Sequence, residues 1–549
     1  MSRGSPNVLL LLSGQHNPRF VGRAGAPVET PTIDRLAATG TTFERAYTAA
    51  PSAGPARGAM LTGRTIDRCR VWDDRSPLRP GVTTLAESFS EAGYTTALVG
   101  TMHLGGDRQF AGFDERPYGD FTGTGGHQFD PVPNPKSRGS PAAARGDGTG
   151  GLYGHRYDPQ SPDRRSPDAW RSLTADAGVS DVPESQRQER AVLEESVAFL
   201  RDSDYEDPDQ PWLLCASFSR PQYPLTAPAR HFERYDPESA SLPGTRRADA
   251  DAGHPLVERK SRADATADLR DPERVDPTDE SVVRRTRAAY FACVDYLDEV
   301  LGDFLARLDR EGFLEETIVV YASDRGNMLG EHGLWWDATW HEGATRVPWF
   351  VQVPEHRVGD EGEGAGADVS TPVSLVDLYP TLCGLAGVDP PSDLDGTDLS
   401  ETVRTGEEPD RGPVFIDHFD SCWGDGTEFR TVCAGQNKYV RFHDAPDRLF
   451  DLSVDSLERV DRAAETPAIA ERLREAVDGS IDFEAVLARR DRDREERSKR
   501  SLPTTWGTTG NAYLLPDRRL VDADATLYRP AEIAKDASHV LDDWPGDDR

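Results

Sequence analysis

Apolar runs alternate along the first two thirds of the chain with segments of helical periodicity. The runs that predict strands lie at 7–12, 95–100, 212–219, 317–323 and 347–353. They lack polar alternation, which is typical of parallel strands covered by helices on both faces. Thr-Pro opens a helix expected at 30–39, and a long helix is expected at 281–310. This order predicts α/β architecture.

Two segments interrupt the alternation. Residues 106–188 are rich in Gly, Pro, Asp and Arg, and residues 238–280 are charged with little periodicity. Both are expected to be long surface insertions in an α/β domain that spans 6–405.

The pattern of predicted helices and strands changes beyond residue 405. Short strands are expected at 430–434, 438–442 and 448–452, followed by a helix at 467–477. They predict a smaller α+β subdomain over 406–480. The charged extension 481–549 contains several prolines and is expected to be partly extended or disordered.

Composition narrows the class of protein. The chain has 549 residues, with 63 Lys and Arg against 96 Asp and Glu, which gives a net charge of −33. So acidic a surface disfavours nucleic-acid binding. Arg supplies almost all the positive charge, and the composition is typical of a protein that stays soluble in concentrated salt.

Cysteine usage and apolar run lengths bear on location. The six cysteines are dispersed, without metal-ligand spacing, so free thiols are expected in a reducing cytoplasm. The apolar run Val8 to Leu12 is too short for a signal peptide, and no stretch is long enough to span a membrane. Oligomeric state stays open.

Several ordered segments carry a family resemblance. They include PNVLLLLSGQH from Pro6, TPTIDRLAATGTTFERAYTAAPSAGPARGAMLTGR from Thr30, ALVGTMHLG from Ala97, ASFSRPQYPLTAP from Ala216 and IVVYASDRGNMLGEHGLW from Ile318. Over about Pro6 to Val460 the chain resembles the sulfatase family of the alkaline phosphatase superfamily, with a texture similar to choline-sulfatase-like and arylsulfatase-like members. The resemblance implies an alkaline-phosphatase-like, mostly parallel sheet flanked by helices, with the smaller C-terminal α+β subdomain.

The family's nucleophile is a Cys or Ser in a C/S-x-P-S-R motif. Here the motif reads Ala53-Gly54-Pro55-Ala56-Arg57. The methyl group of Ala53 offers no oxygen and cannot be converted to the family's aldehyde, so the usual covalent route is closed. The neighbouring Ser52 is a conceivable substitute, although its side chain would leave the turn in another direction.

The family also binds a divalent cation through carboxylates. The resemblance places its ligands at Gly14 and at Asp324-Arg325, and only Asp324 keeps a ligand type. Gln15 is a poor addition, because calcium takes six or more oxygens. We therefore expect no cofactor, or calcium if the site is retained. Arg325 is expected to pair with Asp324. Alternatively, Arg325 points to solvent and Asp324 caps a turn.

The resemblance further implies two lysines that clamp the sulfate and a His that protonates the leaving group. Thr101 and Asp337 stand at the lysine positions, and Gln222 stands at the His position. Arg57 and His103 remain as remnants that contact an anion or, alternatively, are held by Asp324 or a carbonyl. His16, His332 and His341 fall outside the catalytic positions, and His332 is expected to support a loop.

Functional positions have thus changed while the turn and helix-start residues of the scaffold remain. The changed positions are Gly14, Ala53, Ala56, Thr101, Gln222, Arg325 and Asp337. The cleft expected to remain comprises Gln15, Arg57, His103, Gln222, Asp324, Arg325 and Asp337.

Three functions stay open. The first is a pseudoenzyme without sulfate-ester hydrolysis that binds a small polar ligand or an active sulfatase relative. The second is an active sulfatase or phosphatase-type ester hydrolase with an unrecognised nucleophile. The third is an interaction protein that uses its acidic insertions.

Overall fold

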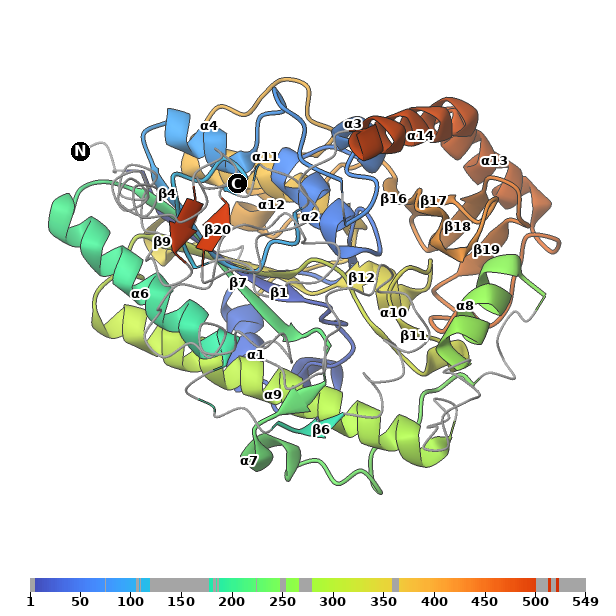
Figure 1. Cartoon of the computed structure of the whole chain (residues 1–549), viewed down its shortest axis with the longest axis horizontal. Coiled ribbons are helices and arrows are strands. Elements are labelled where there is room, and N and C mark those ends of the chain that lie inside the picture. The colour runs from blue at the N-terminus through green and yellow to red at the C-terminus, as the bar shows by residue number, and fades with distance from the viewer. Residues whose placement is uncertain are drawn as a thin grey trace, which may run out of the picture.

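The structure is a computed structural model that describes residues 5–74, 76–104, 108, 110–118, 177–180, 184, 187–223, 225–246, 253–265, 279–357, 365–499, 512–514 and 520–522. Its centre is an eight-stranded sheet (Figure 1). The strand order is β14 (Asp368–Val369), β2 (Thr41–Phe43), β13 (Trp349–Gln352), β9 (Thr317–Ser323), β1 (Asn7–Gly14), β7 (Trp212–Pro221), β4 (Thr95–Gly100) and β5 (Glu115–Tyr118). The predicted α/β fold with a mostly parallel sheet is confirmed.

Helices cover both faces of the sheet (Figure 1). One face packs against α1 (Pro31–Thr39), α6 (Gln188–Glu206) and α9 (Glu280–Arg310), and the other against α2 (Ala53–Thr62), α4 (Leu85–Glu91) and α11 (Leu378–Ala386). Leu9 and Leu11 of β1 belong to the first core, while Val8, Leu10 and Leu12 belong to the second. Side chains of a strand alternate between faces, so the apolar stretch Val8 to Leu12 of β1 supplies both cores.

Strand register gathers the candidate residues at one edge. Ser13 of β1 pairs with Ser323 of β9, Gly14 pairs with Pro221 of β7, and Gly100 of β4 pairs with Ser217. The residues that follow these strands therefore emerge side by side at the carboxyl edge. Ligand sites of α/β sheets form at this edge.

The strand expected at 347–353 differs from its prediction. The structure has β13 there, and it pairs antiparallel with both β9 and β2. A short buried strand has the same apolar pattern in either direction, so the sequence could not reveal its orientation.

The C-terminal part forms the expected smaller α+β subdomain. Its antiparallel sheet comprises β16 (Val414–His418), β17 (Phe429–Ala434), β18 (Asn437–Phe442) and β19 (Arg448–Asp451), with α13 (Pro467–Asp478) against it. The extension is ordered further than expected, because α14 spans Phe483–Lys499. Arg490 of α14 pairs with buried Glu428 at 2.7 Å, and Trp72 donates to Asp493 at 2.8 Å.

The charged segment 238–280 also contains more structure than predicted, since α8 spans Pro255–Ala265. Most of the predicted insertion 106–188 lies outside the described residues. The remaining described α-helices and strands are β3 (Ala46–Tyr47), α3 (Ile66–Cys69), β6 (Gly178–Val179), β8 (Thr226–Ala227), α7 (Ala229–Phe232), β10 (Met328–Leu329), β11 (Trp335–Trp336), α10 (Glu342–Thr345), β12 (Arg346–Val347), β15 (Val373–Ser374), α12 (Ser400–Thr405), β20 (Ala512–Leu514) and β21 (Leu520–Asp522).

The cysteines and the described helices agree with two further expectations. All six cysteines lie in the described residues and are free. None of the described helices has the length and apolarity needed to cross a bilayer.

Candidate functional site

Helix α2 carries the nucleophile motif to the carboxyl edge of the sheet. It begins at Ala53, whose side chain is buried, and Ala56 lies inside its first turn. Ser52 precedes the helix in extended conformation and makes no capping hydrogen bond. Arg57, one turn on, is fully buried. The first turn therefore presents one charged group, Arg57, to the site.

Asp324 follows β9 directly and is fully buried between two guanidinium groups. Its Oδ2 accepts from Arg57 Nε at 2.8 Å and from Arg325 Nη1 at 2.7 Å. Its Oδ1 accepts from the backbone N–H of Gln15 at 3.1 Å. The ion pair with Arg325 that the sequence predicts is thus present. Arg325 is 1% exposed, so the alternative in which it points to solvent is wrong.

Electrostatics in this cluster favour the charged forms. Burial would raise the pKa of Asp324, but the charges of Arg325 and Arg57 outweigh it and lower that pKa. Burial would likewise lower the pKa of Arg325, and the facing carboxylates of Asp324 and Asp337 raise it. Both ion-pair partners therefore remain ionised.

Asp337 closes the cluster on its outer side. Its Oδ2 accepts from Arg325 Nε at 2.6 Å and from Gln15 Nε2 at 3.0 Å, and its side chain is 15% exposed. Arg57, Asp324, Arg325 and Asp337 thus form a row of alternating charges, which we call the buried charge row. Its formal charges sum to zero.

Thr101, which stands at one of the family's two lysine positions, is held by local hydrogen bonds. The carbonyl of Thr101 accepts a close hydrogen bond from Arg57 Nη1, which also donates to Ser217 Oγ at 3.0 Å. The hydroxyl of Thr101 accepts from Gln188 Nε2. Of the two arrangements foreseen for Arg57, the structure has the one in which Asp324 and a carbonyl hold it.

Gln222 fills the space beside Gly14. Its Oε1 lies 3.1 Å from His103 Nε2, and because an amide oxygen only accepts, this His nitrogen carries a proton. A Cβ added at Gly14 would lie 2.8 Å from Gln222 Oε1 and 2.9 Å from the carbonyl oxygen of Ser219. A carboxylate side chain at position 14 therefore requires Gln222 to move.

The family's divalent cation can be tested against these groups. Both oxygens of Asp324 already accept hydrogen bonds, and the guanidinium of Arg325 stands where the resemblance places a second ligand. Within the described part of the chain, no three His, Cys, Asp or Glu side chains gather as a metal site. These residues do not fit calcium, which needs several free oxygens.

Strained backbone surrounds the same edge. Gln15, His103, Trp336 and Ala338 have φ of 58°, 53°, 67° and 59°, in the left-handed region. Such residues cost on the order of 1–3 kcal/mol each and persist where neighbouring contacts hold them. The carbonyl of Gln15, for example, accepts from buried Tyr290 at 2.8 Å.

The other histidines of the motif segments have structural partners. Both ring nitrogens of His16 are engaged, by the Tyr321 hydroxyl at 2.6 Å and the Phe20 carbonyl at 3.1 Å. His332 Nε2 contacts the Leu457 carbonyl at 2.8 Å, and the His341 ring contacts Thr339 at 2.8 Å.

Sequence reasoning missed Gln188 and Ser217, which hold Thr101 and Arg57. Gln188 fell at the end of the predicted insertion 106–188, although it opens α6. Ser217 lies inside an apolar strand, where a single small polar residue gave the only signal.

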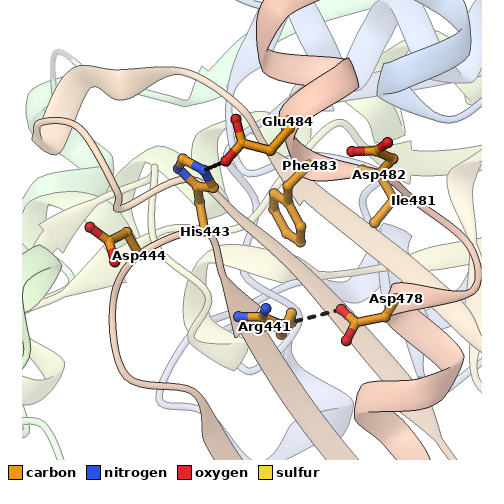
Figure 2. Close-up of a pocket in the computed structure, with 8 residues that line it drawn as sticks. All are labelled: Arg441, His443, Asp444, Asp478, Ile481, Asp482, Phe483 and Glu484. Carbon is orange, nitrogen blue, oxygen red and sulfur yellow. Dashed lines mark hydrogen bonds and ion pairs between the residues drawn. The ribbon is translucent and has the colours of Figure 1, made fainter.

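A cavity of about 680 Å³ lies away from this site, in the C-terminal subdomain. Figure 2 shows Phe483 beside Arg441 and His443, which pair with Asp478 and Glu484 respectively. None of the residues predicted from the sequence lines it.

Comparison with known proteins decides the family, because the sulfatase family profile matches residues 6–388. The chain belongs to the sulfatase family. It is 30% identical over 484 residues to a choline-sulfatase of Rhizobium meliloti, a match that covers 85% of this chain and 84% of that protein. It is 27% identical over 472 residues to an arylsulfatase of Clostridium perfringens, covering 82% and 89%.

Solved structures support the same fold for this sulfatase-family chain. The phosphonate monoester hydrolase of Agrobacterium radiobacter superposes with a TM-score of 0.69 at 22% identity, covering 94% of this chain and 99% of that one. A putative sulfatase from Bacteroides fragilis superposes with a TM-score of 0.62 at 18% identity, covering 89% and 98%. The fold is that of alkaline-phosphatase-like sulfatases.

Proposed function

We propose that this sulfatase-family chain is a pseudoenzyme that does not hydrolyse sulfuric esters by the family's route. The observation that carries the proposal is the position of Asp324 between Arg57 and Arg325. A carboxylate neutralised on both sides is a poor metal ligand, so we also propose that the chain holds no calcium there. The remaining function is to bind a small polar ligand or to regulate an active relative.

The other catalytic groups support this proposal. Ala53 supplies no nucleophilic oxygen, and Gln222 cannot donate a proton to a leaving alkoxide at useful cost. Asp337 places a negative charge where the resemblance expects a sulfate-binding lysine. At an effective dielectric near 20, a charge reversal across a few ångströms opposes an anionic ester by several kcal/mol.

Purified protein in molar potassium chloride is expected to release no product from aryl sulfates or aryl phosphates, with or without added calcium. The measurement is product release over hours against a buffer blank. Replacement of the neighbouring hydroxyl, Ser52→Ala, is expected to change nothing. Turnover that disappears in Ser52→Ala would instead support the alternative, an ester hydrolase with a substitute nucleophile.

Two unpartnered atoms in the site support a proposal for the ligand class. Gln15 Oε1 and Arg57 Nη2 are buried without a hydrogen-bond partner. An acceptor and a donor beside a neutral charge row suit a neutral or zwitterionic polar ligand. In titration calorimetry, sugars or choline-like compounds are expected to bind and their sulfated analogues to bind at least about tenfold more weakly, which corresponds to about 1.4 kcal/mol. Preference for the sulfated analogues would contradict this ligand class.

A further inference from the structure

A second buried polar cluster lies behind the candidate site, where the start of α6 and the ends of β7 and β8 meet α9. It contains Arg187, Glu189, Arg220 and Tyr296, which are exposed by 3% or less. Arg220 lies in the ASFSRPQYPLTAP segment, but the family resemblance assigns none of these four residues to catalysis. Charged groups at such depth are normally paired through direct hydrogen bonds.

Arg187 does not follow this rule. Its Nη2 donates to the Thr226 carbonyl at 2.6 Å, while its Nε and Nη1 have no hydrogen-bond partner. The ion pair that the structure gives it, Nε to Glu189 Oε2, measures 3.9 Å and is too long for a hydrogen bond. Two other buried arginines have a carboxylate at close range, Arg325 at 2.6 Å and Arg430 at 2.6 Å.

The groups around Arg187 do not neutralise the positive charge of its guanidinium. Burial lowers the pKa of Arg187, and the like charge of Arg220 lowers it further, with Glu189 offsetting only part. Glu189 is itself shared, because its Oε1 accepts from Ser219 Oγ at 2.9 Å and lies 3.9 Å from Arg220 Nε.

Tyr296 adds an unused donor. The centre of the Arg187 guanidinium lies 5.0 Å from the centroid of its ring, and its hydroxyl has no hydrogen-bond partner. Several donors therefore surround Arg187, against the one unpartnered acceptor named here, Glu189 Oε2.

We propose that a small inorganic anion of the size of chloride binds beside Arg187, near Arg220, and accepts hydrogen bonds from Arg187 Nε and Nη1 and from the Tyr296 hydroxyl. We choose a monatomic ion because the surrounding side chains are all buried, which disfavours a larger anion. Glu189 opposes the anion, but its charge is countered by the two guanidinium groups. This inference does not depend on the proposed function.

The anion would fix two residues of the candidate site. Gln188, which follows Arg187, donates to the Thr101 hydroxyl, and Arg220 Nη1 donates to the Gln222 carbonyl at 3.0 Å. An ion that holds the start of α6 against β7 and β8 therefore positions Gln188 and Gln222 without contacting the candidate site itself.

The direct test is crystallography of the full chain from potassium bromide, with data collected at the bromine absorption edge. We expect an anomalous peak within hydrogen-bonding distance of Arg187 Nη1 or Nε. Density without anomalous signal at that place, filled by water, would overturn the proposal.

The solution test compares thermal unfolding in chloride, bromide and gluconate at one potassium concentration. Halides are expected to raise the midpoint above that in gluconate, with an apparent halide Kd about tenfold weaker in Tyr296→Phe, because that variant loses a hydrogen bond to a charged group. Arg187→Met is expected to lose the halide effect. The control Arg201→Met, whose side chain is 51% exposed in a pair with Glu311, is expected to keep it. An equal halide effect in Tyr296→Phe and the parent chain would refute the site even if Arg187→Met does not fold.

Discussion

The variant Asp324→Asn is expected to lower the free energy of unfolding by about 3–5 kcal/mol, the range for breaking a buried ion pair by removing one partner. The substitution leaves Arg57 and Arg325 buried, and Asp337 then balances only one of them. Denaturant unfolding in molar potassium chloride, followed by Trp fluorescence, measures the effect.

A matched surface pair provides the control. Asp368, whose side chain is 48% exposed, pairs with Arg23, which is 31% exposed, at 2.7 Å, and Asp368→Asn is expected to cost less than about 1 kcal/mol. Adding Arg325→Met to Asp324→Asn should recover part of the loss, because one buried charge then disappears. A loss at Asp324 no larger than that at Asp368 would mean that the buried charge row does not stabilise the fold.

The structure explains why the sheet could be predicted in such detail. The apolar runs at β1, β4, β7 and β9 are long enough to specify buried strands, and each appears within two residues of its predicted bounds. The antiparallel direction of β13 depends on contacts between distant segments. The same holds for the formation of α14 as an ordered helix. Arg490 and Asp493 reach residues outside α14, and no local periodicity reports such contacts.

At the candidate site, too, local features could be predicted from the sequence, whereas contacts between distant residues could not. The pair of Asp324 and Arg325 was predictable because adjacent residues follow one strand, and a guanidinium cannot bind a metal. The tie between Gln15 and Asp337 joins residues 322 positions apart. The hydrogen bond from Gln188 to Thr101 likewise depends on the packing of α6 against β4. Sequence motifs located the altered positions, whereas only the fold reveals which side chains fill them.

These contacts show how several residues at the altered positions balance charge and fill space. Arg325 supplies positive charge beside Asp324, and Asp337 balances Arg325. Gln222 occupies the space beside Gly14. Arg325 and Asp337 thus balance each other's charge, and Gln222 fits the space that the glycine leaves, so these four residues are complementary. Restoring one family residue alone is therefore expected to destabilise the chain rather than to restore chemistry.

Acidification is expected to destabilise the chain through His16, by about 3 kcal/mol between pH 6.5 and pH 4. Burial lowers the pKa of His16 from 6.5 to about 4, with the Phe20 carbonyl opposing the shift. The unfolded chain binds the proton near pH 6.5, whereas the folded chain binds it only near pH 4. The free energy of unfolding that depends on neutral His16 is therefore fully present above pH 6.5 and is lost as the pH falls toward 4. The measurement is the free energy of unfolding at several pH values for the parent chain and for His16→Gln.

The difference between the two proteins isolates His16. His341 is also buried, and its pKa is lowered mainly by burial, but it is present in both chains, so its contribution cancels. The parent chain should lose stability on acidification more steeply than His16→Gln, and the gap should close by about 3 kcal/mol. A gap that stays constant across this range would mean that His16 accepts a proton in the folded chain as readily as in the unfolded one, and that burial does not hold its ring neutral.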